Sequence, residues 1–166
     1  MSVLAHLYSP IGMLELRGSD AGLHAVRFLD KDDGSAPATA TATALPDCLR
    51  EPHRQLQAYF RRELRDFSLS CASETGTDFQ RQVWAALPSI TYGRTASYLD
   101  LARQLANGKA VRAVGAANGQ NPLALVWPCH RIVGADGSLT GYAGGLPRKR
   151  WLLAFEQPLM QGGLFG

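Results

Sequence analysis

The sequence is poor in cysteine and has no long apolar segment, and each shortage excludes a class of protein. Its 166 residues include three cysteines, Cys48, Cys71 and Cys129, with no Cys-x-x-Cys pair. An odd number at scattered positions argues against a disulfide framework and a four-cysteine zinc site, so we expect free thiols. No apolar run approaches the ~20 residues of a membrane span, and the N-terminus lacks the regions of a signal peptide. These absences favour a cytoplasmic protein that does not enter a membrane.

The sequence also lacks the loops and clusters that hold common cofactors. It has no GxxxxGK[ST] phosphate loop, no glycine-rich dinucleotide or methyl-donor loop after a strand, and no cluster of metal ligands. We therefore expect neither a cofactor nor a metal ion.

Positive charge is concentrated in the second half of the chain. Residues 1–75 hold eight Lys/Arg and ten Asp/Glu, a net charge of −2, whereas residues 76–166 hold nine Lys/Arg and four Asp/Glu, a net charge of +5. All three tryptophans also lie in the second half. A basic half with interspersed aromatic residues suits a polyanion such as nucleic acid, although a merely solvated basic surface is the alternative.

The first half predicts a small domain with a sheet. Three short segments separated by turn residues are typical of an antiparallel meander: 4–9, 12–18 and 22–29. Residues 30–47 are polar, rich in Ala and Thr, and predict a mobile loop or linker. Apolar residues at helical spacing predict a helix over 52–64. A strand over 67–71 and a domain junction over 72–76 follow.

The second half begins with helices. Thr77 and Gln80 have the spacing of a capping box, and one face of the helix that follows is apolar. A second helix over 97–106 is expected to end at Asn107–Gly108, and a third covers 109–118. Two short helices joined by a tight glycine turn form a helix-turn-helix pattern.

The helix over 109–118 consists almost entirely of small residues, with Lys109 and Arg112 as its only charges. A helix that reads bases in the major groove carries side chains such as Arg, Asn or Gln for that purpose. Small residues instead allow the backbone to approach DNA closely, in a minor groove. The pattern therefore predicts DNA contact without sequence specificity, or else a helix packed tightly on a neighbour.

The stretch "VWPCHRIVG", residues 126–134, places Cys129 between Pro128 and His130. Because a central strand does not tolerate proline, Cys129 is expected at a bend or an edge. A neighbouring histidine can supply the base that turns the thiol into a nucleophilic thiolate. Adjacent residues of a regular strand point to opposite faces, so His130 needs a bend or a bridging water to serve Cys129.

A turn and a glycine-rich segment follow, and then a helix starting near Pro147. Glycines around Tyr142 allow a close-fitting wall beside a flat ring. Glu156, late in that helix, is the best available carboxylate to orient His130, although late-helix glutamates are commonly only solvated.

Several motifs together closely resemble the O6-alkylguanine-DNA alkyltransferases. They are "RAVGAANG" at 112–119, "NP" at 121–122, "PCHR" at 128–131, "GYAGG" at 141–145 and "RKRWLLAFE" at 148–156. The resemblance covers about 76–156. It implies a small ribonuclease-H-like α/β domain over 1–70 and a mainly α-helical alkyltransferase domain with a helix-turn-helix over 76–160.

The resemblance also implies the activity. Cys129 would take the alkyl group from O6-alkylguanine in double-stranded DNA, with O4-alkylthymine left open as a substrate, after the nucleotide is flipped out of the duplex. His130 would deprotonate the thiol through a water, Glu156 would hold His130, and Asn121 would brace the bend that presents the cysteine. The resulting thioether has no resolving thiol, so we expect one turnover per molecule. A monomer is expected in the absence of DNA.

Other roles implied by the resemblance concern DNA and the base. Arg112, on the helix that also carries Ala113 and Gly115, would enter from the minor groove and fill the gap in the base stack. Tyr98 would contact the adjoining phosphate and the guanine, and Lys149 lies where the family has a basic residue near the reactive loop. The backbone of Tyr142, Ala143 and Gly144 would line the base pocket.

Two positions depart from the family's usual pattern. Trp127 stands where an aliphatic residue is usual, which leaves the packing behind the cysteine open. Ala143 stands where some members have serine, so one donor to the guanine oxygen is missing.

Three rival functions are compatible with parts of the sequence. A thiol hydrolase would use Cys129 and His130 but would not need a basic helical half. A non-catalytic damage sensor would lack the nucleophile, which is intact here. A transcriptional regulator would carry base-reading side chains on its second helix.

Overall fold

The computed structural model describes residues 2–29, 45–73, 75–105 and 108–157, and these form two compact units. The first unit contains the chain up to Gly76 together with Pro122–Val126, and the second contains Thr77–Asn121 and the chain from Trp127 onward. Within the described ranges, no helix has the length and apolar character needed to cross a membrane.

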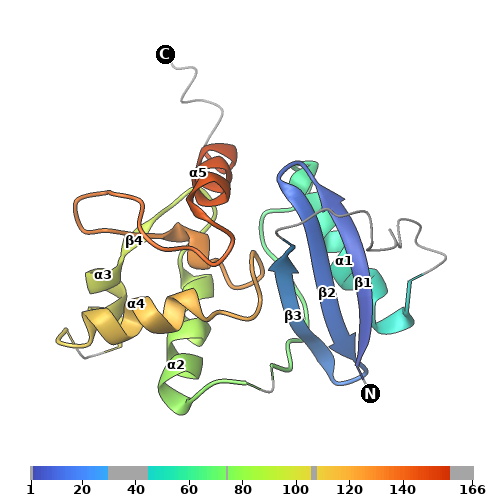
Figure 1. Ribbon diagram of the computed structural model, residues 1–166, viewed down its shortest axis with the longest axis horizontal. Coiled ribbons are helices and arrows are strands. Elements are labelled where there is room, and N and C mark those ends of the chain that lie inside the picture. The colour runs from blue at the N-terminus through green and yellow to red at the C-terminus, as the bar shows by residue number, and fades with distance from the viewer. Residues whose placement is uncertain (1, 30–44, 74, 106–107, 158–166) are drawn as a thin grey trace. The chain divides into compact units, whose positions relative to one another are not determined.

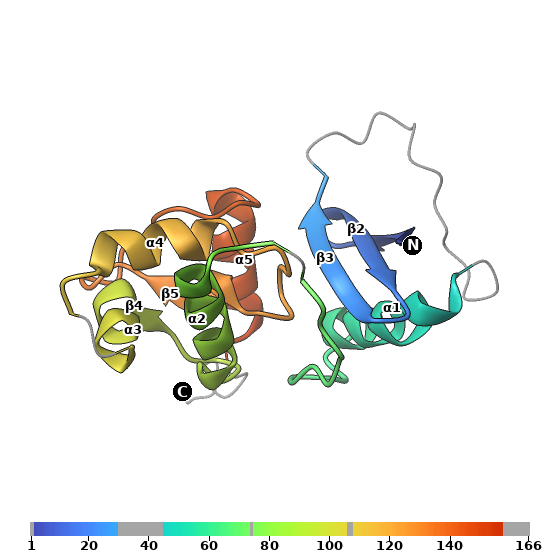
Figure 2. The same ribbon diagram turned by 90° about the horizontal axis from the view of Figure 1, so that it is seen from below.

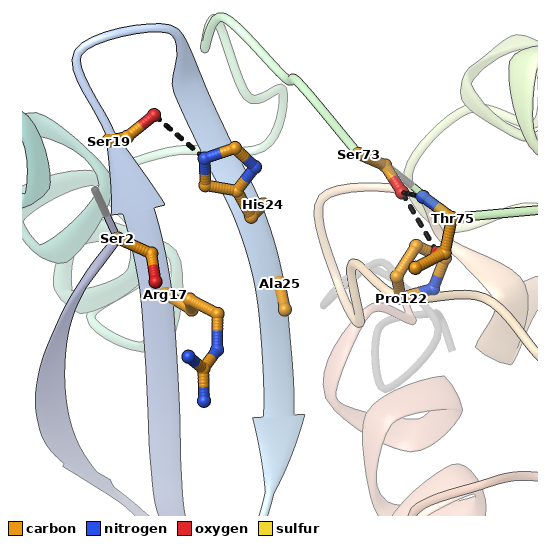
Figure 3. A pocket seen from close by; sticks show the side chains of 8 residues that line it. All are labelled: Ser2, Arg17, Ser19, His24, Ala25, Ser73, Thr75 and Pro122. Atoms are coloured by element: carbon orange, nitrogen blue, oxygen red, sulfur yellow. Dashed lines mark hydrogen bonds between the residues drawn. The ribbon is translucent and has the colours of Figure 1, made fainter.

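The first unit is built on an antiparallel sheet of three strands in the order β1-β2-β3 (Figure 1). Strand β1 covers Val3–Ser9, β2 covers Gly12–Ser19 and β3 covers Gly22–Phe28. The predicted meander is therefore confirmed. Alternate residues are buried because one face of the sheet packs on a helix, α1 (Figure 2). At the β2–β3 turn, Ser19 and His24 are hydrogen-bonded at 2.8 Å (Figure 3).

Helix α1 runs over Asp47–Phe60, so the predicted range 52–64 is wrong at both ends. The helix passes through Pro52, where a missing N–H removes a single backbone hydrogen bond and the rest of the helix continues. Its end is set by Arg62, whose φ of 64° reverses the chain while the Glu63 amide donates to the Ala58 carbonyl. Residues 30–44 of the predicted loop lie outside the described residues, and 47 belongs to the helix.

The predicted strand over 67–71 is reduced to one isolated bridge between Leu23 and Cys71. The Leu23 amide donates to Ser70 and the Ala72 amide donates to Leu23. Gly22 makes this close approach possible: its φ is +138°, and a Cβ there would lie 2.8 Å from the Ser70 carbonyl oxygen.

The second unit is mainly helical. Its helices are α2 (Asp78–Ala86), α3 (Tyr98–Gln104), α4 (Val111–Gly119) and α5 (Leu146–Phe155), with 3₁₀ turns η2 (Leu87–Ser89) and η3 (Cys129–Arg131). A two-stranded parallel sheet joins β4 (Ala96–Ser97) to β5 (Ile132–Val133). The predicted architecture, a small α/β domain followed by a mainly helical domain, is confirmed.

Local sequence signals explain where these helices begin. Thr77 and Gln80 form the predicted capping box, in which each side chain binds the other residue's backbone amide. Ser97 and Asp100 form a second one at the start of α3. The predicted end of α3 at Asn107 lies outside the described residues.

Helices α3 and α4 pack against each other, as the helix-turn-helix pattern predicts. Val114 and Ala117 of α4 belong to the same buried cluster as Leu101 and Ala102 of α3. The indole of Trp84 in α2 donates to the Ala117 carbonyl at 2.7 Å. Small residues on α4 thus serve tight packing on the buried side of the helix.

The apolar stretch 121–133 bends in two places. Leu123 forms a bridge with Val26 of β3, and a turn follows in which Leu125 has a φ of 72°. The chain then turns again at η3 before β5. Cys129 therefore lies at a bend, as the proline before it predicts.

Candidate active site

Cys129 is buried at the first position of η3, directly after Pro128. Residues of a 3₁₀ turn do not alternate between two faces as those of a strand do. Cys129 and His130 therefore need not point in opposite directions. The Cys129 amide donates to the Trp127 carbonyl at 2.7 Å, and the Arg131 amide donates to the Pro128 carbonyl at 3.0 Å. The backbone that presents the thiol is therefore held on both sides.

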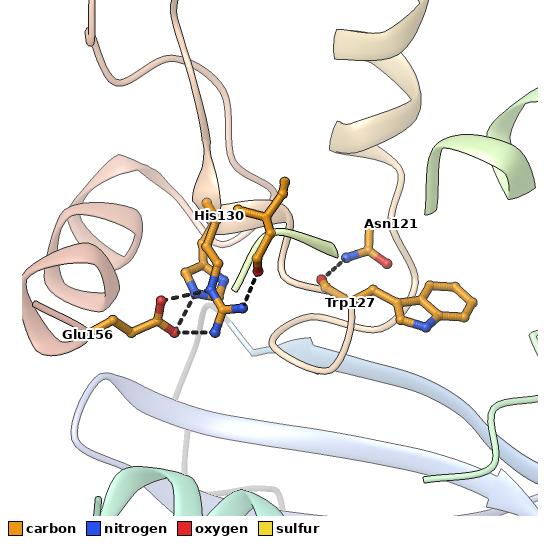
Figure 4. Close-up of polar contacts among 6 residues, drawn as sticks. Asn121, Trp127, His130 and Glu156 are labelled. Atoms are coloured by element: carbon orange, nitrogen blue, oxygen red, sulfur yellow. Dashed lines mark hydrogen bonds and ion pairs between the residues drawn. The ribbon is translucent and has the colours of Figure 1, made fainter. Parts of the chain in front are cut away.

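His130 is fully buried and bonded to Glu156 at the C-terminal end of α5 (Figure 4). The distance from His130 Nε2 to Glu156 Oε2 is 2.8 Å. Arg131 binds the same carboxylate with two nitrogens, Nε at 2.8 Å and Nη2 at 3.0 Å, and donates through Nη1 to the Ile90 carbonyl at 2.7 Å. One carboxylate thus orients both side chains that follow the cysteine.

The charge state of this network follows from its contacts. Burial opposes ionisation of Glu156, but hydrogen bonds from His130 and Arg131 outweigh it and lower the pKa of the carboxyl to about 2. Burial lowers the pKa of His130, against the opposite effect of Glu156, so the imidazole is neutral at pH 7. Because the carboxylate can only accept, the proton of the neutral ring is on Nε2. Nδ1 is left with a lone pair and has no hydrogen-bond partner among the described residues.

The thiol itself is held in its protonated form. Burial raises the pKa of Cys129 to about 11, although the Asn121 amide, the positive charge of Lys149 and a backbone hydrogen bond act in the opposite direction. A thiol with this pKa reacts at neutral pH only if a base removes its proton. His130 Nδ1 is the buried base beside it in the chain.

Two asparagines fix the backbone around the cysteine. Asn121 donates to the Trp127 carbonyl at 2.7 Å (Figure 4), and its amide also hydrogen-bonds the thiol. Asn118, buried on α4, donates to the Cys129 carbonyl at 3.2 Å. Trp127, the unusual residue before the proline, stacks on Trp84 with ring centroids 5.9 Å apart. The packing behind the cysteine is therefore an aromatic pair.

Tyr98 and Lys149 hold the glycine-rich loop that precedes α5. The Tyr98 hydroxyl donates to the Thr140 carbonyl at 2.9 Å. The buried Lys149 ammonium donates to the carbonyls of Thr140 and Gly141, and lies 5.9 Å from the centre of the Tyr98 ring. Burial lowers the pKa of Lys149, and Cys129 offsets part of this effect. The ammonium group in turn favours ionisation of the Cys129 thiol.

The loop 142–144 contributes differently at each position. Tyr142 packs against the core of the unit, and its hydroxyl is buried with no hydrogen-bond partner in the described part of the chain. Ala143 is exposed, and the Gly144 carbonyl accepts from Arg148 at 3.1 Å. Burial raises the pKa of the Tyr142 hydroxyl, and the nearby Cys129 raises it further.

Arg112 and Ala113 lie on the exposed side of α4, outside this buried network. Gly115 is half-buried, and a Cβ there would lie 3.6 Å from the Tyr98 ring. Helix α4 therefore presents one positive side chain and small residues to solvent, while Asn118 on its buried side reaches the cysteine backbone.

The sequence alone predicts no role for Arg131 or Asn118. In the structure Arg131 binds the Glu156 carboxylate and Asn118 binds the Cys129 carbonyl. A signal for Arg131 was available: a charged residue inside an apolar run needs a buried partner. No comparable signal marks Asn118, since asparagine near a helix end most often only terminates the helix. Within the described ranges, no group of three or more His, Cys, Asp or Glu side chains is placed to hold a metal ion.

Comparisons with known proteins identify the family of this chain. The family profile of the 6-O-methylguanine DNA methyltransferase DNA binding domain matches residues 78–158, and that of the ribonuclease-like domain matches residues 3–72. A methylated-DNA–protein-cysteine methyltransferase of Methanosarcina acetivorans is 46% identical over 148 residues, which cover 89% of this chain and 94% of the relative. One from Mycolicibacterium paratuberculosis is 47% identical over 149 residues, covering 90% and 88%.

Solved structures give the same result. The crystal structure of the Mycobacterium tuberculosis O6-methylguanine methyltransferase is 40% identical, covers all of both chains and superposes with a TM-score of 0.80. The OGT of the same organism in complex with DNA is 43% identical, covers 92% of each chain and has a TM-score of 0.79. The chain therefore belongs to the 6-O-methylguanine DNA methyltransferase family.

Proposed function

We propose that this protein repairs O6-alkylguanine in double-stranded DNA by transferring the alkyl group to its own Cys129. The observation that carries the proposal is the buried thiol beside a neutral histidine that an ionised glutamate and an arginine hold in place. The names of the relatives, methylated-DNA–protein-cysteine methyltransferases, support the same reaction. O4-alkylthymine stays an open second substrate.

In this reaction His130 Nδ1 accepts the thiol proton through a water, while Glu156 stabilises the cation that forms on the ring. The thiolate attacks the alkyl carbon, so an S–C bond forms as the bond between that carbon and O6 breaks. The electron pair of the broken bond stays on guanine, which is protonated as it leaves. Sulfur ends as a thioether, and because no resolving thiol is needed or used, each molecule reacts once.

DNA binding is proposed for α4 in a minor groove and is largely independent of sequence. The exposed Arg112 would fill the gap that the flipped nucleotide leaves, while Ala113 and Gly115 permit close approach of the helix. Tyr98 would contact the adjoining phosphate and the guanine, and the backbone of 142–144 would line the base pocket. Phosphate contacts would supply most of the affinity, so binding should weaken steeply with salt.

The domain assignment is part of this proposal. We assign residues 1–70 to an α/β domain and 76–160 to the alkyltransferase domain, which carries the cysteine and the DNA-binding helices. The cytoplasmic location and the monomeric state in the absence of DNA stay predictions.

The deciding experiment is intact-mass spectrometry after mixing the protein with a duplex that carries one O6-methylguanine. We expect the mass of one methyl group to be added, peptide mapping to place it on Cys129, and no further gain with excess DNA. Cys129→Ala should show no gain. Cys71→Ala, which removes a half-buried thiol in the other unit, is the matched control and should react like the wild type.

Other outcomes would separate the rival functions. Binding to the lesion with no change of mass would support a damage sensor and contradict the proposal. Removal of more than one methyl group per protein molecule would contradict the single turnover.

A further inference from the structure

The chain leaves the second unit briefly, just before it reaches the reactive cysteine. Asn121 and Trp127 belong to the second unit, whereas Pro122–Val126, which we call the crossing segment, belongs to the first. A hydrogen bond joins the two ends of this excursion, because the Asn121 side chain donates to the Trp127 carbonyl at 2.7 Å (Figure 4). Contacts that hold the crossing segment therefore act, through the chain itself, on the residues that lead to Cys129.

The crossing segment is anchored on the outer edge of β3, the last strand of the sheet. The Val26 amide donates to the Pro122 carbonyl at 2.9 Å, and the Val26 carbonyl accepts from the Ala124 amide at 3.0 Å. These two bonds make the isolated parallel bridge between Val26 and Leu123. Both bridge residues are buried, so water does not compete for the bonds.

An irregularity of β3 makes this anchor possible. Leu23 and Val26 both present their backbone to the outer edge, where Leu23 bridges Cys71. In a regular strand, residues that present both backbone groups to the same edge are an even number of positions apart. His24 lies between two residues of β3 whose partners on β2 are consecutive, so it is the extra residue of a β-bulge. The bulge thus turns the backbone of Val26 toward the crossing segment.

The crossing segment ends in a strained turn. The Val126 amide donates to the Ala124 carbonyl at 2.8 Å, and Leu125 between them has a φ of 72°. This combination is a γ-turn of the rarer hand, which is unfavourable for a residue with a side chain. Such a conformation persists only where the surroundings fix it. The bridge to Val26 on one side and the burial of the Leu125 side chain supply those constraints.

A second tight turn leads from the crossing segment to the thiol. The Cys129 amide donates to the Trp127 carbonyl at 2.7 Å, and Pro128 between them has φ −79° and ψ 67°, the values of an inverse γ-turn. The Trp127 carbonyl therefore accepts from both Asn121 and Cys129. Two tight turns close together leave the backbone little freedom, so a displacement of the crossing segment reaches Cys129.

We propose that the edge of β3 at Val26 is a positioning element for alkyl transfer, so that the first unit contributes to the rate of the reaction. The inference rests on the proposed function and deepens it. Without the anchor, the turn at Leu125 can relax to a negative φ, and the Trp127 carbonyl is no longer held beside Asn121. The thiol then spends less time where it can attack, and small displacements of a reacting group cost much of a rate.

The test removes one hydrogen bond of the anchor from the full chain. Ala124 is replaced by lactic acid, its α-hydroxy analogue, which keeps the methyl side chain and loses the N–H that donates to Val26. The single-turnover rate on a saturating O6-methylguanine duplex should fall about three- to tenfold, the factor in an equilibrium that one hydrogen bond is usually worth. Affinity for the duplex and the pH dependence of the rate should not change, because α4, His130 and Glu156 are intact.

The matched control places lactic acid at Ala72. The Ala72 amide donates to Leu23 on the same edge of β3 at 2.9 Å, but it does not touch the crossing segment, so the rate should stay that of the wild type. A second pair of variants is Leu123→Ala and Leu16→Ala. Each removes a fully buried leucine that pairs with Val26, and we expect only Leu123→Ala to slow the transfer.

Three results would overturn the inference alone. They are wild-type rates for both the ester at Ala124 and Leu123→Ala, equal slowing by the test variants and their controls, and a loss of duplex affinity that matches the loss of rate. Equal slowing would mean that any loosening of the first unit has the same effect. A wild-type protein that gains no methyl group on Cys129 would instead overturn the proposed function, and this inference with it.

Discussion

Among the residues that the structure describes, a histidine, a glutamate and an arginine meet twice, once on the sheet of the first unit and once inside the second. On the sheet, Glu15 lies 3.4 Å from His6 Nε2 and 3.0 Å from Arg27 Nε. Inside the second unit, Glu156 lies 2.8 Å from both His130 Nε2 and Arg131 Nε. The side chain of Arg27 is 64% exposed, whereas that of Arg131 is 5% exposed.

The same three residue types therefore differ in what they contribute to stability and to the position of a proton. On the sheet, the exposed Arg27 can be replaced by water, while the side chains of His6 and Glu15 keep only 11% and 12% of their surface exposed, so a partner lost there is replaced in part. In the buried cluster no water replaces a lost partner, so each group depends on the other two. Burial is what converts a common surface arrangement into one that orients a base.

The largest effect is expected from removing the buried carboxylate. Glu156→Gln leaves the Arg131 guanidinium buried without a counter-charge and should lower the free energy of unfolding of the second unit by about 3–5 kcal/mol. Glu15→Gln should cost less than Glu156→Gln, because its partner Arg27 reaches water. Urea unfolding followed by tryptophan fluorescence reports the second unit, because all three tryptophans belong to it. Hydrogen exchange of β1 and β2 amides reports the first. An unchanged urea midpoint for Glu156→Gln would contradict the comparison.

Removing the buried histidine should slow alkyl transfer by about 100-fold or more at pH 7, the usual contribution of a general base. In His130→Gln the thiolate must form unaided, and since the pKa of Cys129 is about 11, the rate should rise about tenfold per pH unit from pH 7 to 9. The wild-type rate should rise less steeply, because neutral His130 already accepts the proton. Single-turnover kinetics on an O6-methylguanine duplex measures both slopes. His6→Gln is the control, and a wild-type slope equal to that of His130→Gln would rule out the base.

A smaller effect is expected from changing the buried arginine while keeping its charge. Lysine cannot reproduce the two-nitrogen contact of Arg131 with Glu156 together with the bond to Ile90, so Arg131→Lys should slow alkyl transfer about tenfold. Affinity for the duplex should be unchanged, since Arg131 is buried. Arg27→Lys should change neither quantity. Gel-shift titration measures the affinity and single-turnover kinetics measures the rate. A loss of affinity equal to the loss of rate would refute the positioning role.

The smallest effect is expected where the site depends on backbone atoms. Asn121 and the Cys129 amide bind the carbonyl of Trp127 and not its ring, so Trp127→Leu should change the transfer rate less than about threefold. Loss of the stack on Trp84 should destabilise the second unit by about 1 kcal/mol. The same fluorescence and kinetic measurements apply. A rate loss comparable to that of His130→Gln would show that the indole itself holds the reactive loop.

Sequence reasoning succeeded where a feature depends on residues close together in the chain. The capping box of Thr77 and Gln80 is read directly from a three-residue spacing, and the turn residues between three short segments indicate a meander. It failed where distant packing overrides local preference. Pro52 lies inside α1 because the helix packs on the sheet, and residues 67–71 form one bridge where a strand was expected.

The candidate site divides in the same way. A nucleophile at a bend with an adjacent base could be proposed from three consecutive residues, Pro128, Cys129 and His130. Glu156 could be proposed as the partner of His130 only as the best of few carboxylates. The contacts of Arg131 with Glu156 and of Asn118 with Cys129 could not be predicted, because they join segments that are brought together by packing.

The sequence by itself therefore determined the order of the main elements, the capped start of α2 and the candidate nucleophile, because short-range spacing controls each of them. Only the tertiary structure decided which charges are buried together, and hence that Glu156 is ionised, His130 is neutral and Cys129 holds its proton. The physical reason is that a pKa depends on desolvation and on neighbours in space, and neither can be read from positions along a chain.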